Sequence, residues 1–319
     1  MTHSERTGHA HPRRARDLAG GRDGLCCIRL REVIDKARVL IEALPYIKEF
    51  RGKTVVVKIG GAALDDAALR RRFAEDVVLL HWVGLQVIVV HGGGVQVSAM
   101  LDRLGLTAAF VDGMRVTDAA ALEVVEMVLG GTLNKDLVRL VQQLGGRAVG
   151  LTGTDGGLAR ARRVERAPGG QDLGLVGEVE AVDRRVIDRL LPDFIPIVAP
   201  LAVDQDGQTL NVNADPFAAA LAIALGAEKL VLLTDTEGVK DGGGALIPSL
   251  TAGEARRLRA SGAVRGGMIP KLENALAALE SGVHKVHIID GRLEHALLLE
   301  IFTRAGVGTQ FIESESETA

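Results

Sequence analysis

Two lysines stand beside glycine pairs, where an ammonium group could meet a bound anion. Lys58 comes near the end of a β-branched run and precedes the pair Gly60–Gly61. Lys271 follows the pair Gly266–Gly267 and falls in the first turn of an expected helix, where the helix dipole disfavours a cation unless an anionic ligand is present. Glycine amides can approach such an anion closely. An anion site at each lysine is one interpretation, and a solvated lysine next to a turn is the other.

The tetrad His91–Gly94 follows a strand-like run and precedes a helical stretch. Three residues without Cβ let backbone N–H groups converge on a phosphate or an oxyanion, and the dipole of the following helix adds to this attraction. Lipase-like hydrolases use a similar tetrad, but they also need the motif Gly-x-Ser-x-Gly, which this sequence lacks. A tight strand-to-helix turn would use the same glycines.

A lone arginine, Arg115, lies in a turn just before another helical stretch. Its guanidinium could bind a carboxylate through two parallel hydrogen bonds. A surface arginine that pairs with Asp118 fits the same segment.

A polar group surrounds the start of a later helix. Asn211 and Asn213 share one face of an extended segment, so they offer donors and acceptors to an amide-bearing ligand. Pro216 is typical of the first helical position, and we therefore expect Asp215 to be the N-cap of that helix.

Several other classes of site are excluded. The segment Gly52–Thr54 resembles the end of a P-loop, but it lacks the preceding glycine and leads into a strand. No Gly-x-Gly-x-x-Gly joins the first strand to a helix, so a dinucleotide fingerprint is absent. His284 and His287 would face opposite sides of a strand, and we predict no protein metal site.

Composition favours a small-molecule partner. The 319 residues carry 38 Lys plus Arg against 41 Asp plus Glu, and one Trp, one Tyr and seven Phe are too few for a nucleic-acid stacking surface. The only cysteines, Cys26 and Cys27, are adjacent, which favours a reducing cytoplasm. Residues 1–24 contain no apolar core of a secretory signal, and the apolar stretch Val77–Leu101 is broken by polar and glycine residues. We expect neither export nor a membrane span.

The segments that position these residues alternate between strand-like and helical runs. Helices are expected near 67–82, 119–129, 134–144, 215–225, 252–260 and 271–281. Mostly apolar, strand-like runs predict strands at Thr54–Ile59, Val87–Val90, Ala148–Leu151, Ile195–Val198, Lys229–Thr234 and Lys285–Ile289. Such strands are covered on both faces, which is typical of a parallel sheet with crossover helices. We predict an α/β fold with a lobe boundary near Gly226.

An amphipathic helix precedes the first strand. Apolar residues recur at helical spacing over Val33–Leu44, Pro45 is expected to end the helix, and Tyr46 follows it. The segment before this helix is expected to be disordered.

The motifs Lys-x-Gly-Gly, His-Gly-Gly-Gly, Gly-Met-Arg-Val-Thr, Asn-Val-Asn-Ala-Asp and Gly-Gly-Met-Ile-Pro-Lys occur in that order. From about Val33 to Ile312 the chain resembles the amino acid kinase family, and within it the branch that phosphorylates the side-chain carboxylate of N-acetyl-L-glutamate in arginine biosynthesis. The resemblance implies a three-layer αβα sandwich with a central, mainly parallel sheet and two lobes. It also implies ATP as phosphoryl donor, with Mg²⁺ held mainly by the nucleotide phosphates.

The resemblance assigns roles by motif. The implied catalytic residues are Lys58, Lys271 and Asp215, of which the acid holds the two lysines in position. The implied substrate contacts are Gly93, Gly94, Arg115, Asn211 and Asn213. The implied ATP contacts are Gly60, Gly61, Thr234, Asp235, Gly238, Val239, Gly266, Gly267 and Met268.

Members of this branch that are inhibited by arginine carry an extra N-terminal helix. The resemblance implies that residues 28–50 form this helix and link dimers into a hexamer, after a disordered extension at 1–27. It further implies an N-lobe at 51–226 for acetylglutamate binding and dimerisation, and a C-lobe at 227–319 for ATP and arginine. The implied arginine site contains Tyr46, His287, Glu300 and Gly306.

Two alternatives stay open at this stage. Another carboxylate or carbamate kinase of the same family would share most of these motifs. A non-catalytic arginine or nucleotide sensor could keep the fold, although it would not need all three charges of Lys58, Asp215 and Lys271.

Overall fold

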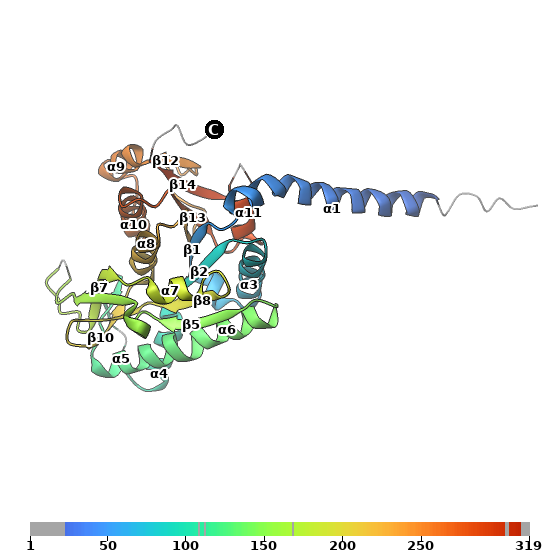
Figure 1. The fold of residues 1–319 in the computed structure, drawn as a ribbon. Helices are drawn as coiled ribbons and strands as arrows, with labels where there is room; N and C mark the ends of the chain where they lie inside the picture. The colour runs from blue at the N-terminus through green and yellow to red at the C-terminus, as the bar shows by residue number, and fades with distance from the viewer. Residues whose placement is uncertain (1–22, 108, 112, 168, 304–305, 314–319) are drawn as a thin grey trace, which may run out of the picture. The chain divides into compact units, whose positions relative to one another are not determined.

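The computed structural model describes residues 23–107, 109–111, 113–167, 169–303 and 306–313 (Figure 1). The chain divides into two compact units, residues 1–45 and 46–319, and each is treated by itself. Of the extension expected at residues 1–27, residues 1–22 lie outside the described part, and the rest belongs to the first helix.

Helix α1 spans Asp23–Phe50 and contains Pro45. The prediction that Pro45 ends this helix is wrong. A proline removes one backbone donor and disfavours a helix interior, but hydrogen bonding resumes beyond it, with the amide of Arg51 donating to Ile47 O at 3.1 Å. Within the second unit the last turn is fixed by Phe50, which is only 5% exposed and has the Lys229 ammonium 4.6 Å from its ring centre.

An eight-stranded sheet forms the centre of the second unit, in the order β12-β14-β13-β11-β1-β2-β8-β5. Its strands are β1 (Thr54–Ile59), β2 (Gln86–His91), β5 (Ala148–Thr152), β8 (Ile195–Ala199), β11 (Lys229–Thr234), β12 (Ser249–Thr251), β13 (Lys285–Asp290) and β14 (Gly308–Ile312). All neighbouring strands are parallel except β13 and β14, which are antiparallel. The predicted, mainly parallel sheet is confirmed.

Helices cover both faces of this sheet (Figure 1). Along β1, Val55 and Val57 belong to one buried hydrophobic cluster and Val56 belongs to the other, as the two-residue period of a strand requires. The first cluster includes residues of α2 (Ala62–Asp65), α3 (Ala67–Trp82), α4 (Gly94–Arg103), α5 (Ala119–Glu126), α6 (Asn134–Gln143) and α11 (Ala296–Phe302). The second includes residues of α8 (Ala214–Leu225), α9 (Ala252–Ala260) and α10 (Met268–Glu280). The three-layer αβα prediction is confirmed.

One sheet runs across the position where the lobe boundary was expected. β11 follows Gly226 in sequence and pairs in parallel with β1, which precedes it. The division of function between residues 51–226 and 227–319 stays a prediction.

A small closed barrel, which the sequence did not predict, lies beside the main sheet. Its strands are β6 (Ala159–Arg163), β7 (Val176–Val182), β9 (Leu201–Val203) and β10 (Thr209–Val212). A two-stranded hairpin of β3 (Phe110–Val111) and β4 (Met114–Arg115) carries the predicted arginine. The remaining elements are a π-helical segment (Met127–Leu133), a 3-10 turn (Asp155–Gly157) and α7 (Arg185–Leu190). No helix in the described ranges is both long and apolar enough to cross a bilayer.

Candidate active site

Two lysines and one carboxylate meet at the ends of three elements. Lys58 is the second-last residue of β1, whereas Asp215 and Lys271 lie in the first turns of α8 and α10. The Nζ of Lys58 lies 2.8 Å from Oδ1 of Asp215, and the Nζ of Lys271 lies 2.5 Å from Oδ2. The three side chains are at most 18% exposed. The fold therefore brings residues from three separate motifs into one buried group, hereafter the lysine–aspartate group.

The electrostatics of the lysine–aspartate group favour an anionic ligand. Burial alone would raise the pKa of the Asp215 carboxyl, but Lys58 and Lys271 lower this pKa to about 2. The carboxylate is thus ionised at neutral pH and anchors both ammonium groups. Each ammonium has three N–H donors, so donors that Asp215 does not use are available to a bound anion.

The turn after β1 leaves room for the Lys58 ammonium. A Cβ at Gly60 would lie 2.6 Å from Nζ of Lys58, so any larger residue there would displace the ammonium. Beyond this turn, the amide of Ala62 donates a hydrogen bond of 2.8 Å to Oδ1 of Asp235, the residue that follows β11. The ends of β1 and β11 are therefore tied together where Lys58 lies.

Asn213, not Asp215, is the N-cap of α8. The helix begins at Ala214, and Oδ1 of Asn213 accepts a hydrogen bond of 3.1 Å from the amide of Asp215. Pro216 then stands third in the helix, where its missing N–H costs no intrahelical bond. This corrects the capping prediction for a physical reason: because Asn213 caps the helix, the Asp215 carboxylate is free to bind both lysines.

The glycine tetrad lies next to the end of β1, because the amide of Gly92 donates to Ile59 O at 2.8 Å. Gly93 has a φ of +153°, and a Cβ there would lie 2.5 Å from a methyl carbon of Leu129, so only glycine fits. Burial lowers the pKa of His91 to about 4, and its ring is neutral. Its Nδ1 lies 2.8 Å from Gly92 O, to which it donates.

Arg115 lies against the same loop. Its Nη2 donates to Gly94 O at 2.7 Å and to Ser98 Oγ at 2.8 Å. The residue is 8% exposed, and burial lowers the pKa of its guanidinium. A short chain of hydrogen bonds continues from it: Asn211 Nδ2 donates to Thr117 Oγ1 at 3.1 Å, and Thr117 Oγ1 donates to Arg115 O at 2.9 Å. Hydrogen bonds thus connect Arg115 to Gly94 directly and to Asn211 through Thr117, and Gly93 precedes Gly94 in the chain. The fifth predicted substrate contact, Asn213, lies exposed at the start of α8.

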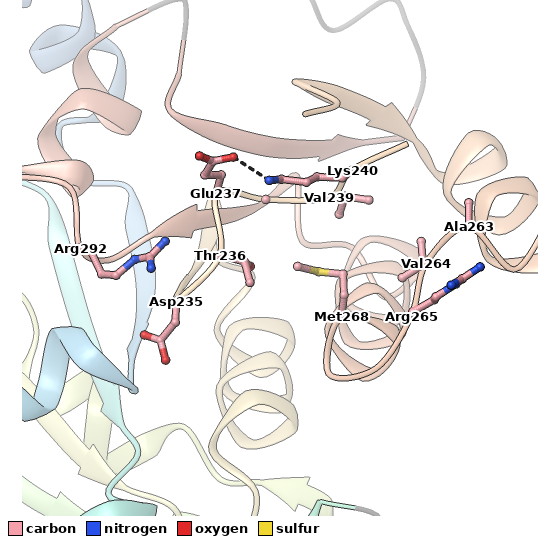
Figure 2. Close-up of a pocket in the computed structure, with 11 residues that line it drawn as sticks. Asp235, Thr236, Glu237, Val239, Lys240, Ala263, Val264, Arg265, Met268 and Arg292 are labelled. Carbon is pink, nitrogen blue, oxygen red and sulfur yellow. Dashed lines mark ion pairs between the residues drawn. The ribbon is translucent and has the colours of Figure 1, made fainter. Parts of the chain in front are cut away.

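A pocket of about 360 Å³ opens beside α10. Figure 2 shows its lining, which comes from residues 235–240, residues 263–265, Met268 and Arg292. The predicted nucleotide contacts that line it are Asp235, Gly238, Val239 and Met268. Of the other predicted contacts, Thr234, Gly266 and Gly267 adjoin lining residues in sequence, and Gly60 and Gly61 form the turn after β1. Lys271 stands one helical turn after Met268, so α10 joins the pocket to the lysine–aspartate group.

Three residues of the predicted arginine site also come together. The Nδ1 of His287, in β13, lies 2.6 Å from Oε1 of Glu300, in α11. Oε2 of Glu300 accepts a hydrogen bond of 2.9 Å from the amide of Val307, which follows Gly306. Burial lowers the pKa of His287. Tyr46 packs, half-buried, against the first hydrophobic cluster of its own unit.

A model of the amino acid kinase family matches residues 53–290. The chain belongs to the amino acid kinase family. A protein named acetylglutamate kinase from Chromobacterium violaceum is 54% identical over 282 residues, which cover 87% of this chain and 98% of that protein.

Solved structures resemble this amino acid kinase over 87% of its length. N-acetylglutamate synthase from Neisseria gonorrhoeae, complexed with coenzyme A and N-acetyl-glutamate, has a TM-score of 0.78 and 30% identity. The same enzyme complexed with coenzyme A and L-arginine has a TM-score of 0.75 and 28% identity. This chain covers only 63% and 65% of those two chains.

Side chains that the sequence did not single out support this amino acid kinase site. Asn134, fully buried, lies 3.2 Å from Nε2 of His91 through its Nδ2 and also donates to Ile197 O at 2.8 Å. Ser98 and Thr117 hold Arg115 from two sides. Asn134 is followed directly by Lys135 and Asp136, so neither it nor Ser98 gives a clear signal in the sequence.

Proposed function

We propose that this protein transfers the terminal phosphoryl group of ATP to the side-chain carboxylate of N-acetyl-L-glutamate, forming N-acetylglutamyl 5-phosphate in arginine biosynthesis. The lysine–aspartate group carries this proposal. β1 joins it to the glycine tetrad and Arg115 on one side, and α10 joins it to the pocket on the other. The name of the relative from Chromobacterium violaceum supports the same reaction.

This reaction needs charge stabilisation more than it needs a base. A glutamate side chain has an ordinary pKa of about 4.3, so the attacking carboxylate is already ionised at neutral pH. What opposes the reaction is repulsion between this carboxylate and the nucleotide phosphates. One ammonium about 4 Å from an oxyanion contributes roughly 4 kcal/mol at an effective dielectric constant of 20. Lys58 and Lys271 would supply two such charges, held in place by Asp215.

The substrate would be oriented from the glycine tetrad. The amides at Gly93 and Gly94 would face its acyl and carboxylate oxygens, and the Arg115 guanidinium would bind its α-carboxylate. Asn211 and Asn213 would serve the N-acetyl amide and carboxylate, since their side chains both donate and accept. Bound in this way, the substrate would present its γ-carboxylate to the lysine–aspartate group.

The nucleotide would occupy the pocket lined by residues 235–240, residues 263–265, Met268 and Arg292. This pocket combines apolar side chains for a base, such as Val239 and Met268, with cationic side chains for phosphates. Among the described residues, no group of three or more His, Cys, Asp or Glu side chains could hold a metal ion. Mg²⁺ often binds phosphates with few protein ligands, so the nucleotide phosphates would hold most of it, and it would neutralise part of their charge.

We further propose L-arginine as an inhibitor, a homo-oligomer built through α1, and a cytoplasmic location. The cluster of His287, Glu300 and Gly306 supports the first of these, because the Glu300 carboxylate could pair with the guanidinium of arginine. The exposed apolar side chains of α1 support the second, because such side chains are typical of an interface.

The test is an assay of ADP release with four acceptors: N-acetyl-L-glutamate, L-glutamate, L-aspartate and carbamate, each with and without L-arginine. We expect the highest kcat/KM with N-acetyl-L-glutamate. Preference for another acceptor would instead assign the chain to a different carboxylate or carbamate kinase activity. Nucleotide binding without acceptor-dependent ADP release from any of the four would indicate a sensor.

A further inference from the structure

The Arg115 guanidinium is hydrogen-bonded through one terminal nitrogen and, within the described part of the chain, unpaired at the other. Its Nη2 is used twice, by Gly94 O and by Ser98 Oγ. Its Nη1 is buried and has no hydrogen-bond partner among the residues that the structure describes. A buried donor without a partner is costly, so this nitrogen is the one that a carboxylate would reach.

An aromatic ring covers the face of the same guanidinium. The Cζ of Arg115 lies 4.6 Å from the ring centre of Phe110. The two residues are direct cross-strand partners in the β3–β4 hairpin, so the hairpin register sets the stack. Phe110 is 55% exposed. Burial in a core therefore does not account for a phenylalanine here, but stacking on Arg115 does.

We propose that Phe110 is a positioning residue for the acceptor substrate. Its ring fixes the plane of the Arg115 guanidinium, and Ser98 fixes one edge, so Nη1 is aimed at the α-carboxylate before the substrate binds. This inference deepens the proposed function and rests on it. A guanidinium stacked on a ring loses less freedom when it binds a carboxylate, and this preorganisation favours binding.

The expected effect is weaker binding of the α-carboxylate of N-acetyl-L-glutamate. Phe110→Leu keeps an apolar side chain but removes the ring, and we expect the KM for N-acetyl-L-glutamate to rise about fivefold with kcat within about twofold of the original enzyme, in line with a modest cation–π contact. Phe110→Tyr keeps the ring and should restore the original KM. Ser98→Ala should raise KM in the same sense without touching the hairpin.

The experiment uses the full chain and two acceptors, N-acetyl-L-glutamate and 4-acetamidobutanoate, which lacks the α-carboxylate. The original enzyme tests the proposed function, because activity with N-acetyl-L-glutamate must be present before any ratio is taken. We then expect Phe110→Leu to lower kcat/KM about fivefold for N-acetyl-L-glutamate and to leave kcat/KM for 4-acetamidobutanoate unchanged.

Calorimetric titration of each variant with N-acetyl-L-glutamate, without ATP, measures the dissociation constant directly. We expect Phe110→Leu to raise this Kd about fivefold, as it raises KM. Leu104→Ala, an exposed apolar change at the end of α4, is the control and should change neither acceptor. An equal loss with both acceptors, or no loss with N-acetyl-L-glutamate, would overturn the role of Phe110 while leaving the proposed function intact.

Discussion

Among the lysines whose side chains the structure describes, Lys58 and Lys271 differ by sharing one buried carboxylate. Lys271→Met keeps the length of the side chain but removes its charge. We expect kcat for ADP release to fall by about 10²–10³, the usual cost of removing one transition-state donor, with saturating ATP and N-acetyl-L-glutamate. Lys53→Met is the control, because Lys53 is half-exposed and pairs with Glu228 at 3.1 Å. Undiminished turnover in Lys271→Met would show that this lysine is not part of the reaction.

Asp215 gives a prediction about stability and pH. Its pKa is lowered to about 2 in the folded protein, against an ordinary value of about 3.9. The folded state thus holds fewer protons on this group, so its contribution is complete above about pH 4 and is lost as pH falls toward 2. Between pH 6 and pH 3 the difference in unfolding free energy between the original chain and Asp215→Asn should shrink by about 1 kcal/mol, measured by urea unfolding. A difference that does not change with pH would contradict the lowered pKa.

At the scale of single residues, the sequence predicts those site residues whose type is unusual for their local position. Lys58, Arg115 and Lys271 stand out because a cation beside glycines or in a turn needs an explanation. The cap at Asn213 was missed because Asn213 and Asp215 are both good caps, and the choice depends on which side chain two distant lysines attract. Ser98 could not be found, since its role depends on a guanidinium brought to it by another element.

At the scale of elements, the long central strands were predictable and the small barrel was not. β11 is buried at all six positions and its four central residues are apolar, which is a strong strand signal. β6 instead reads Ala-Arg-Ala-Arg-Arg, which alternates but has no β-branched or aromatic residue, and β9 has only three residues, so neither gives a strong strand signal. Only closure with β7 and β10 makes them strands. For helix α1 the sequence predicted an end that the structure does not have. The helix continues past Pro45, and its last turn packs through the buried Phe50.

The junction between α3 and α11 gives a prediction at this scale. Asp76 of α3 is 2% exposed, lies 2.5 Å from Nδ1 of His295, and accepts backbone hydrogen bonds from Leu297 and Leu298. Asp76→Ala would leave the first turn of α11 without these acceptors, which costs about 1–3 kcal/mol. Amide hydrogen exchange of α11 should therefore become at least about fivefold faster.

The exchange experiment for Asp76 is best run at pH 8. Burial raises the pKa of Asp76 to about 6, so its carboxylate is charged at that pH. The control is Arg72→Ala, because Arg72 pairs with Glu294 at the surface of the same junction, and exposed pairs contribute little. If Arg72→Ala accelerated exchange in α11 as much as Asp76→Ala, the buried carboxylate would not be the anchor.

At the scale of the whole second unit, the parallel sheet explains why distant motifs meet. β1, β2, β11 and β13 all run the same way, and their registers align Ile59 with His91 and Thr234 with Asp290. The carboxyl ends of these strands thus form one edge, which is where ligands bind in open α/β sheets. The lysine–aspartate group, the glycine tetrad and the pocket all follow strand ends or helix starts at this edge.

This arrangement separates catalysis from the proposed assembly through α1, since the lysine–aspartate group, the tetrad and the pocket belong to residues 46–319. A chain that lacks residues 1–45 should keep ADP release within about twofold. It should lose most of its inhibition by L-arginine and show a smaller mass by light scattering, because the exposed side chains of Val39, Leu40 and Ile41 would be gone.

A substitution in the full-length chain can show whether the deletion acts by removing the apolar surface of α1 or only by shortening the chain. Leu40 is 71% exposed, so Leu40→Glu should leave the folding of each unit unchanged while opposing burial of this helix in an interface. We expect it to reduce both the mass and the arginine inhibition, as the deletion does. Glu42→Ala, an exposed polar change on the same helix, should reduce neither. If inhibition persists in both Leu40→Glu and the deletion, arginine acts without α1, and the cluster of His287 and Glu300 would have to bind it alone.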